Sequence, residues 1–460
     1  METSFLDALR AALPAAALTI SDTKTAYETD WLNEFPGRAL AVVRPQTTQE
    51  VSTAIKLCAQ HGVAAIPQGG NTGLVGGAAP ATETPAVILQ LGRMNRIRHL
   101  DTNAAVVEAG CVLSALQDAA QEADRLFPMS LGSEGTAQIG GLLSTNAGGI
   151  MALRYGVMRD LVLGLEVVLP DGTIWSDLST LRKRNVGLDP KHLFIGSEGT
   201  MGIITAASLR LVARPKARVA ALLALQDLSH APLLCNLAQG LSGGSLDACE
   251  LIPRQGVAFA VEHVSSVKPP LDPMPEWSIL LELSGETAET LETQMMQIFE
   301  AALEQGLAHD GVLATSENQR AAFWLLREAI VEGQRLAGPQ LKHDVAVPVP
   351  SVPDFISRAQ ALVLEIEPAA KVSAFGHLGD GNIHFNLTLP PEADRTTLEY
   401  SVYKLALELG GTLSAEHGLG RKKAKLARDL GAGHGFPIDL KSLIDPQATL
   451  NPGCLDGLRG

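Results

Sequence analysis

A short segment near the end of the chain combines histidines with turn residues. It runs from Phe375 to Asn386 and reads Phe-Gly-His-Leu-Gly-Asp-Gly-Asn-Ile-His-Phe-Asn. Its central Gly-Asp-Gly-Asn is typical of a tight turn, and its flanks are typical of short strands. A hairpin of this kind would place His377 and His384 side by side on one face, where their imidazoles could act together.

A second segment, Ser414–Gly420, adds an acid and an imidazole in a glycine frame, Glu416 and His417. Two histidines and a carboxylate with open positions left over suit a divalent metal, with Zn²⁺ expected first and Mn²⁺ or Fe²⁺ as alternatives. The other interpretation is that the histidines are only hydrogen-bonded residues around tight turns. A metal would lower the pKa of a substrate hydroxyl, so a neutral imidazole could remove its proton near pH 7. We predict His417 as that general base. The predicted ligands are His377, His384 and Glu416.

Two cations could bind an acidic substrate. Arg327 lies on the predicted amphipathic helix Glu317–Leu336, where it either forms a surface ion pair or faces a pocket and binds a carboxylate through its guanidinium fork. Lys342 precedes a strand-like run, Val345–Val349.

Three glycine-rich loops in the N-terminal half could hold a phosphate-bearing cofactor. The first, Pro67–Gly73 with Gly76 after it, follows a predicted strand at Val63–Ile66. Its consecutive N–H groups, unhindered by Cβ atoms, would make a donor cradle; the alternative is a tight turn without a ligand. The second, Gln138–Gly149, is so rich in small residues that a backbone or a flat ligand must approach closely. The third, Leu193–Ile204, is expected to be a buried strand running into a turn.

These loops contain neither GxGxxG nor GxxxxGK[ST], so the usual dinucleotide and nucleoside-triphosphate fingerprints are absent. The pentapeptide Gly-Ser-Glu-Gly-Thr occurs twice, at 132–136 and 196–200, which favours a shared role.

The order and the residue sequences of the three loops resemble those of the FAD-binding domain of the vanillyl-alcohol oxidase (p-cresol methylhydroxylase) flavoprotein family. The resemblance extends over about Ala39 to Arg214. Some relatives attach FAD to a histidine in the first loop; this loop has none, so the resemblance implies non-covalent FAD. It places the first loop at the FAD pyrophosphate and the third near the adenosine. By position, the implied cofactor-binding residues are Pro67, Gln68, Gly69, Gly70, Asn71, Thr72, Gly73, Gly76, Ser133, Thr136, Gly140, Asn146, Gly148, Gly149, Glu198, Gly199, Ile203 and Asn451.

The remainder of the chain resembles the FAD-linked dehydrogenases of D-2-hydroxy acids, a group that acts on D-lactate and D-2-hydroxyglutarate. The resemblance implies the metal ligands and base named above, hydride transfer to FAD, and substrate contact by Arg327 and Asn386. Lys342 with the following His-Asp looks like the 2-hydroxyglutarate branch, where this lysine serves a dicarboxylic acid. Val331 departs from that branch, which tends to carry a hydroxyl there. The expected reaction is D-2-hydroxyglutarate to 2-oxoglutarate, with lactate, malate or another acid left open.

The alternation of strand-like and helical runs predicts an α+β protein. We expect a helical segment at 1–38, a two-part FAD-binding domain at 39–214, and an α+β substrate domain with an antiparallel sheet at 215–410. Residues 411–460 would return to the flavin. Predicted helices are Gln49–Gln60, Glu286–Gln305, Glu317–Leu336 and Asp394–Leu409. Predicted strands include Val87–Leu91, Ala105–Glu108, Leu165–Leu169, Val219–Leu225 and Ser278–Leu283.

The net charge of −14 over 460 residues argues against nucleic acid and anionic membrane surfaces as partners. The five cysteines are scattered and form no CxxC, and no secretory signal or apolar run of spanning length is present, so we expect a cytoplasmic protein without a membrane span. Expected partners are a small anionic 2-hydroxy acid and an electron acceptor, either an electron-transfer flavoprotein or a quinone; a homodimer is a further expectation.

Other functions remain open at this point. An oxidase would pass electrons to oxygen. A metal-dependent hydrolase would use the histidines and need no flavin, and a flavin- or acid-binding sensor would hold a cofactor that no substrate reduces.

Overall fold

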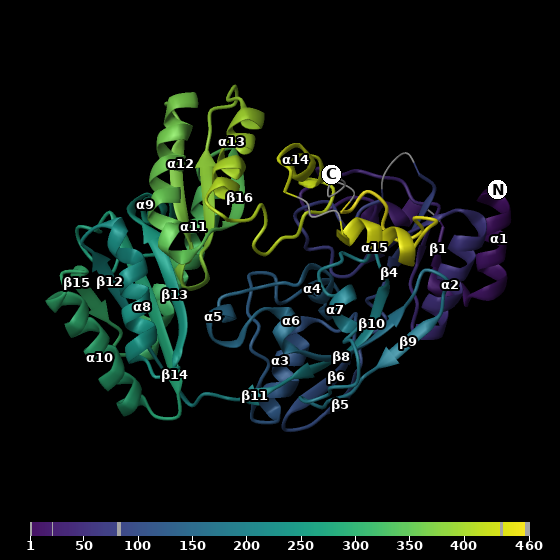
Figure 1. Ribbon diagram of the computed structural model, residues 1–460, viewed down its shortest axis with the longest axis horizontal. Coiled ribbons are helices and arrows are strands. Elements are labelled where there is room, and N and C mark those ends of the chain that lie inside the picture. The colour runs from purple at the N-terminus through teal and green to yellow at the C-terminus, as the bar shows by residue number, and fades with distance from the viewer. Residues whose placement is uncertain (1, 21, 81–83, 433–435, 456–460) are drawn as a thin grey trace. The chain divides into compact units, whose positions relative to one another are not determined.

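The computed structural model describes residues 2–20, 22–80, 84–432 and 436–455, which form two compact units (Figure 1). The first unit contains the described residues up to Gly149, those from Tyr155 to Arg214, and those from Glu416 onward. The second contains Ile150–Arg154 and Pro215–Ala415. No helix within the described ranges is long and apolar enough to cross a membrane.

A four-stranded sheet begins the first unit, in the order β1-β2-β4-β3, with β2, β4 and β3 parallel. Its strands are β1 (Leu18–Thr19), β2 (Ala41–Val43), β3 (Ala64–Gln68) and β4 (Ala86–Gln90), and its helices are α1 (Glu2–Ala12) and α2 (Thr48–His61). The stripe of apolar residues on α2 is buried against the sheet, and the Thr47 side chain caps its start by accepting from the Glu50 amide. The predicted helix at Gln49–Gln60 is therefore confirmed.

The second sheet of the first unit is antiparallel, in the order β5-β6-β10-β8-β9. Its strands are β5 (Ile97–Leu100), β6 (Ala104–Glu108), β8 (Val162–Val168), β9 (Ile174–Asp177) and β10 (Ile203–Arg210), and β7 (Arg125–Leu126) pairs with β11 (Val212–Ala213) separately. The other helices of this unit are α3 (Leu113–Glu122), α4 (Ile139–Thr145), α6 (Met158–Leu161), α7 (Lys191–Phe194), α14 (Ala424–Asp429) and α15 (Phe436–Ile444), with α5 (Ala152–Tyr155) beginning in the second unit. Its apolar core lies between this sheet and α3, α4 and α6.

The third glycine-rich loop was predicted to be a buried strand followed by a turn, and this order was wrong. A turn of helix, α7, precedes the glycine turn, and strand β10 begins only at Ile203. The apolar run at Leu193 suggested a buried strand, but the Leu193 side chain is exposed and Pro190 starts a helical turn. Short apolar runs of this kind do not distinguish a helix from a strand.

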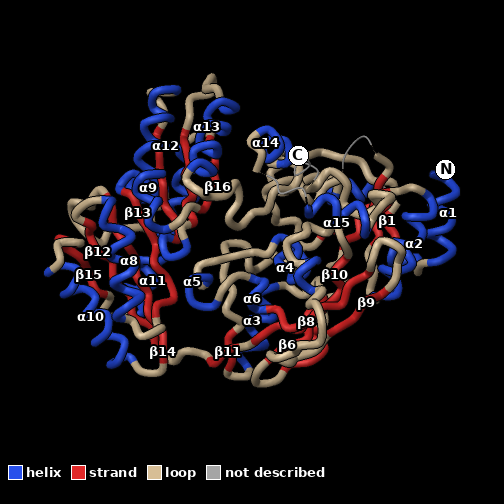
Figure 2. Tube along the Cα trace, viewed as in Figure 1, coloured by secondary structure: helices blue, strands red, loops and turns tan. Residues whose placement is uncertain are grey.

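The second unit is built on a seven-stranded antiparallel sheet, in the order β15-β12-β14-β13-β17-β18-β16, whose strands are red in Figure 2. The strands are β12 (Ala217–Leu225), β13 (Leu246–Pro253), β14 (Trp277–Gly285), β15 (Ala308–Leu313), β16 (Gln340–Ala346), β17 (Lys371–His377) and β18 (Asn382–Thr388). The helices are α8 (Ala231–Leu241), α9 (Arg254–His263), α10 (Ala288–Glu304), α11 (Glu317–Ala337), α12 (Val352–Ile366) and α13 (Arg395–Glu408). The predicted antiparallel sheet is confirmed, as are the three helices predicted in this region.

The expected strand at Val345–Val349 was placed too late. Strand β16 ends at Ala346, and Pro348 lies between it and a short 3-10 turn. Proline has no N–H to offer to a sheet ladder, so the strand forms on the N-terminal side and includes Lys342.

The two faces of this sheet differ. Helices α9 and α11 pack with Phe375 and Ile252 on one face. On the other face, Phe355 of α12 packs against Phe385 of β18. Because side chains alternate along a strand, His384 and Asn386 lie on the same face as α11, opposite to Phe385.

Candidate functional site

The predicted hairpin forms the centre of the candidate site in the second unit. Strands β17 and β18 pair so that Phe375 is opposite His384 and His377 is opposite Asn382. The ring centroids of His377 and His384 are 5.5 Å apart, and the rings are nearly perpendicular. The turn between them needs Gly381, whose φ is +80° and whose added Cβ would meet the Val347 carbonyl oxygen at 2.0 Å. The side-by-side arrangement of the two histidines is confirmed.

A buried carboxylate that the sequence analysis missed, Glu250, lies beside this hairpin. Glu250 is opposite His377 across β13 and β17 and is 1% exposed. Its Oε1 is 2.6 Å from His377 Nδ1, and its Oε2 accepts a hydrogen bond of 2.7 Å from Arg327 Nε. Burial acts to raise the Glu250 pKa, but the charges and hydrogen bonds of His377 and Arg327 outweigh it and lower the pKa to about 2. Glu250 is therefore a carboxylate that joins two of the predicted functional residues.

Arg327 is buried rather than part of a surface ion pair. It is 7% exposed, and its guanidinium carbon lies 4.9 Å from the centroid of the Phe375 ring. Its ionic partner is Glu250, from a strand distant in the sequence, so the surface-pair interpretation was wrong. Whether the guanidinium binds a substrate carboxylate stays a prediction.

Asp344 is a second buried acid on the same face. It is opposite His384 in the pairing of β16 with β18, and its Oδ1 is 3.9 Å from His384 Nδ1. The same oxygen accepts a hydrogen bond of 3.0 Å from Asn382 Nδ2. Each histidine of the hairpin thus has a carboxylate close to its Nδ1.

Asn386 and Lys342 form the next cross-strand residue pair on this face of the sheet. They are opposite each other in β18 and β16, with Asn386 buried and Lys342 exposed. Asn386 Nδ2 donates to Gln334 Oε1 at 3.1 Å, and Gln334 Nε2 has no partner among the residues that the structure describes. Val331, one helical turn before Gln334 on α11, is 41% exposed. The site therefore contains an amide pair whose spare N–H group faces no acceptor of the described chain.

The two histidines suit a metal ion chemically. In His377 the Nδ1 atom faces a carboxylate, so Nε2 is the ring nitrogen that would bind a metal. Histidine ligands of metals commonly have a carboxylate hydrogen-bonded to the other ring nitrogen. Glu250 is such a partner for His377, whereas the nearest Asp344 oxygen is 3.9 Å from His384 Nδ1. The second unit thus provides two imidazole donors that fit a divalent cation.

The first unit brings the first two glycine loops together. A Cβ on Gly70 would lie 2.0 Å from the Thr136 carbonyl oxygen, and one on Gly69 would lie 3.4 Å from the Gln138 side chain. The Gln68 amide fixes the first loop by donating to the carbonyls of Tyr27 and Ala78. Gly70 is required here because a side chain would push the first loop away from the segment that leads into the second loop.

Three polar side-chain oxygens of the predicted cofactor-binding loops and of Asn451 have no partner in the described part of the chain. The buried oxygens Asn71 Oδ1, Gln138 Oε1 and Asn451 Oδ1 accept no hydrogen bond from any residue in the described ranges. Gly73 has open space around its Cβ position. Buried polar atoms are almost always satisfied, so a polar ligand or water belongs beside these oxygens. These residues fit the polar part of FAD.

Glu198 and Asn451 hold loops together within the first unit. Both Glu198 carboxylate oxygens accept backbone N–H groups at 2.8 Å, from Leu419 and Gly420. Asn451 Nδ2 donates to the carbonyls of Gly77 and Glu198. Burial raises the Glu198 pKa, while these two backbone donors act in the opposite direction. Glu198 therefore anchors the segment that carries the predicted acid and base.

Glu416 and His417 belong to the first unit, where they directly precede the anchored residues. A Cβ on Gly148 would lie 3.6 Å from Glu416 Oε1, so this carboxylate lies beside the second glycine loop. Their roles as metal ligand and base stay predictions.

Several other predicted cofactor residues have clear packing roles. Cβ atoms on Gly140, Gly149 and Gly199 would collide with Ala109, Ser130 and Pro67 respectively. Asn146 ends α4 with a φ of +53° and accepts from the Arg159 amide, and Ile203 is buried in the apolar core. Pro67 lies at the end of β3, and Thr72 and Gly76 lie in the loop after it. Their contact with FAD stays a prediction.

The two copies of Gly-Ser-Glu-Gly-Thr do not share a conformation. Gly196, Glu198 and Gly199 all have positive φ, whereas the copy at 132–136 has no such residue. In that copy Thr136 is exposed, and its hydroxyl donates a hydrogen bond to the Ser133 carbonyl oxygen. The expected shared role is not supported by the backbone.

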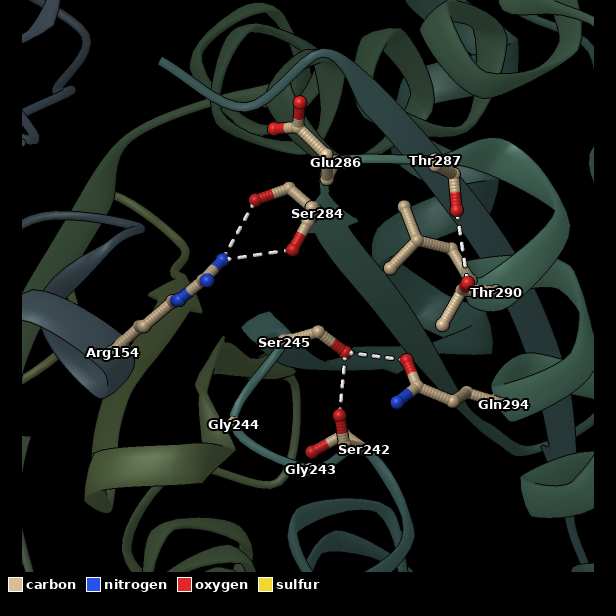
Figure 3. A pocket seen from close by; sticks show the side chains of 12 residues that line it. Arg154, Ser242, Gly243, Gly244, Ser245, Ser284, Glu286, Thr287, Thr290 and Gln294 are labelled. Atoms are coloured by element: carbon tan, nitrogen blue, oxygen red, sulfur yellow. Dashed lines mark hydrogen bonds between the residues drawn. The ribbon is translucent and has the colours of Figure 1, made fainter. Parts of the chain in front are cut away.

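A separate polar pocket lies in the second unit (Figure 3). Arg154 Nη1 donates to Asp247 at 2.7 Å and to the Ser284 carbonyl and hydroxyl at 3.0 and 2.8 Å. Ser245 links the other side by donating to Ser242 and Gln294. None of the residues predicted to act on a substrate lines this pocket, so it is distinct from the candidate site.

Comparisons with known proteins agree with this architecture. A family model described as FAD binding domain matches residues 39–177, and one described as FAD linked oxidases, C-terminal domain, matches residues 214–455. D-2-hydroxyglutarate dehydrogenase, mitochondrial, of Danio rerio is 36% identical over 454 residues, covering 97% of this chain and 84% of that protein. A putative mitochondrial D-lactate dehydrogenase of Schizosaccharomyces pombe is 36% identical over 442 residues, covering 93% and 84%.

The fold likeness extends to solved structures. The structure of p-cresol methylhydroxylase with substrate bound matches with a TM-score of 0.76 at 17% identity, covering 99% of this chain and 96% of that one. The predicted vanillyl-alcohol oxidase type of fold is therefore confirmed.

The cytoplasmic expectation is contradicted, because the relatives are named as mitochondrial proteins. It rested on the absence of a secretory signal, and that absence does not distinguish the cytoplasm from an organelle. In fold and in sequence over most of its length, the chain belongs to the FAD-linked oxidase family and is an FAD-dependent dehydrogenase.

Proposed function

We propose that this enzyme oxidises D-2-hydroxyglutarate to 2-oxoglutarate. The observation that carries the proposal is the polar sheet face of the second unit. There the adjacent imidazoles of β17 and β18 lie near the pair formed by Asn386 of β18 and Lys342 of β16, and Arg327 lies over Phe375. A dicarboxylic 2-hydroxy acid needs one cation for each carboxylate and a polar centre for its hydroxyl. D-Lactate and D-malate are the alternative substrates, because Val331 stands where the 2-hydroxyglutarate branch tends to carry a hydroxyl side chain.

The residues divide the chemistry between them. Arg327 binds the carboxylate next to the hydroxyl, and Lys342 binds the distal one with help from Asn386. His417 takes the hydroxyl proton, and the hydrogen on the same carbon leaves with its electron pair, so a C=O bond forms. FAD, when bound non-covalently by the glycine loops, supplies the acceptor for that hydride. A divalent metal such as Zn²⁺, when held by His377, His384 and Glu416, would supply the charge that favours the alkoxide.

The two electrons removed from the substrate must then leave the enzyme. We propose an electron-transfer flavoprotein or a quinone as acceptor, and a homodimer as the assembly.

The first test is an anaerobic visible spectrum of the purified protein, before and after separate additions of D-2-hydroxyglutarate, D-lactate and D-malate. Bleaching of the flavin bands by D-2-hydroxyglutarate is the expected result. A yellow protein that only D-lactate or D-malate bleaches would contradict the proposed substrate. A protein that stays colourless after FAD is added would contradict the proposed chemistry.

Lys342 provides a test of substrate choice. In Lys342→Ala the KM for D-2-hydroxyglutarate should rise about 10- to 100-fold, because a charged hydrogen bond of about 1.5–3 kcal/mol is lost. The KM for D-lactate, which has no distal carboxylate, should change little. Steady-state kinetics on both acids with an artificial electron acceptor would measure this difference. Equal losses on the two substrates would show that Lys342 does not read the distal carboxylate.

A further inference from the structure

Three elements of the second unit meet at the Glu250 carboxylate. Its two oxygens face different partners: one is 2.6 Å from His377 Nδ1 of β17, and the other accepts from Arg327 Nε of α11. Arg327 lies over the Phe375 ring, and Phe375 and His377 both pack against the His384 ring, with centroid distances of 5.3 and 5.5 Å. The contacts therefore form a closed ring of five side chains that includes both histidines.

The hydrogen bond at Nδ1 decides which form of His377 is available. A neutral imidazole that donates from Nδ1 to a carboxylate has its lone pair at Nε2, which is the form that a metal binds. The same carboxylate occupies Arg327 Nε, so the terminal guanidinium nitrogens are left to meet a substrate carboxylate. Glu250 thus orients both His377, which would act at the substrate hydroxyl, and Arg327, which would bind the substrate carboxylate.

A purely stabilising ion pair would not need this geometry. Glu282, on the adjacent strand β14, is also buried and also binds α11, through Arg320 Nη1 at 2.6 Å and Trp324 Nε1 at 2.7 Å. It has no histidine partner among the described residues. Buried ion pairs add little net stability compared with apolar packing. Stability is therefore a weak explanation for the Glu250–Arg327 pair, which joins α11 to the sheet a second time beside Glu282–Arg320.

We infer that Glu250 is a positioning residue that fixes His377 for metal binding and Arg327 for substrate binding at the same time. The inference rests on the proposed function for its substrate half, and on the two histidines alone for its metal half. It predicts that the two binding events fail together when this one carboxylate is changed.

The test compares Glu250→Gln with Glu282→Gln in the FAD-loaded protein. The dissociation constants of Zn²⁺ and Mn²⁺ would be measured by competition with a coloured chelator, in the absence of substrate. Glu250→Gln should weaken binding of the preferred metal about 10- to 100-fold, as changes behind a metal ligand commonly do. The KM for D-2-hydroxyglutarate should rise as well, while Glu282→Gln should retain wild-type metal binding and KM.

A second variant covers the case in which Glu250→Gln does not fold. Glu250→Asp keeps the charge but shortens the side chain by one methylene, so it should also weaken metal binding, which flavin absorbance and thermal unfolding can separate from misfolding. Unchanged metal affinity in a folded Glu250 variant would overturn the inference, as would an equal loss in Glu282→Gln or a wild-type protein that binds neither metal. Failure of every D-2-hydroxy acid to bleach the flavin would contradict the proposed function and leave the metal comparison unaffected.

Discussion

Replacement of His384 by alanine is expected to abolish turnover of the D-2-hydroxy acid and leave the flavin spectrum intact. The His384 ring lies 5.5 Å from that of His377 and 5.3 Å from Phe375, so its loss removes one of the two imidazole donors of the hairpin. Without it the hydroxyl proton is not activated, and the rate should fall at least about 100-fold, the lower end of what positioned proton transfer contributes. The glycine loops belong to the other unit and should still bind FAD.

A histidine elsewhere in the same sheet provides the control. His309→Ala changes an exposed residue on β15, at the opposite edge from β16, and should keep wild-type turnover. Steady-state assays and the visible spectrum of both variants would be compared. Normal turnover in His384→Ala would remove the histidine pair from the proposed chemistry.

The second large effect is expected at the glycine loops. Gly70→Ala should yield a protein that has lost most of its FAD. The new Cβ would lie 2.0 Å from the Thr136 carbonyl oxygen, so the first loop would have to move away from the segment that leads into the second loop. The clashing atom belongs to the backbone and not to a flexible side chain, so the overlap cannot be removed by a change of rotamer and the backbone must shift. The ratio of flavin to protein absorbance, before and after incubation with FAD, measures the loss.

Gly240→Ala is the matched control for this substitution. Gly240 lies on α8 in the second unit, and a Cβ there meets nothing within 4 Å. Alanine should stabilise the helix slightly and leave the FAD content unchanged. A Gly70→Ala protein as yellow as this control would show that the loop contact does not shape the cofactor site.

The hairpin was predictable because its information is local. Glycines at a turn, with a strand on each side, specify both the pairing and the face, so His377 and His384 could be placed together from twelve consecutive residues. Glu250 could not be found in this way. It meets His377 across 127 positions of sequence, and no periodicity relates one acid in an apolar strand to a distant imidazole.

The environment of Arg327 and the role of Glu198 were undetermined for the same reason. A helical arginine has the same sequence pattern whether it faces solvent or a buried carboxylate. Only the tertiary structure, which places Arg327 of α11 against Glu250 of β13, decides between them. Glu198 was assigned to the cofactor from its motif, but its carboxylate accepts backbone N–H groups from a segment more than two hundred residues later. Asp344 was likewise visible only once β16 and β18 were paired.

The return of the chain from the second unit to the first has a consequence for biosynthesis. Ala65 forms a bridge with Leu450, and the Thr200 carbonyl accepts from Lys441, so early and late segments complete the same unit. During translation the glycine loops emerge long before these partners exist, while all of Pro215–Ala415 is available to fold as one continuous stretch. The second unit can therefore fold on the ribosome first, with Ile150–Arg154 already synthesised, and the first unit is completed only when the late segments have emerged.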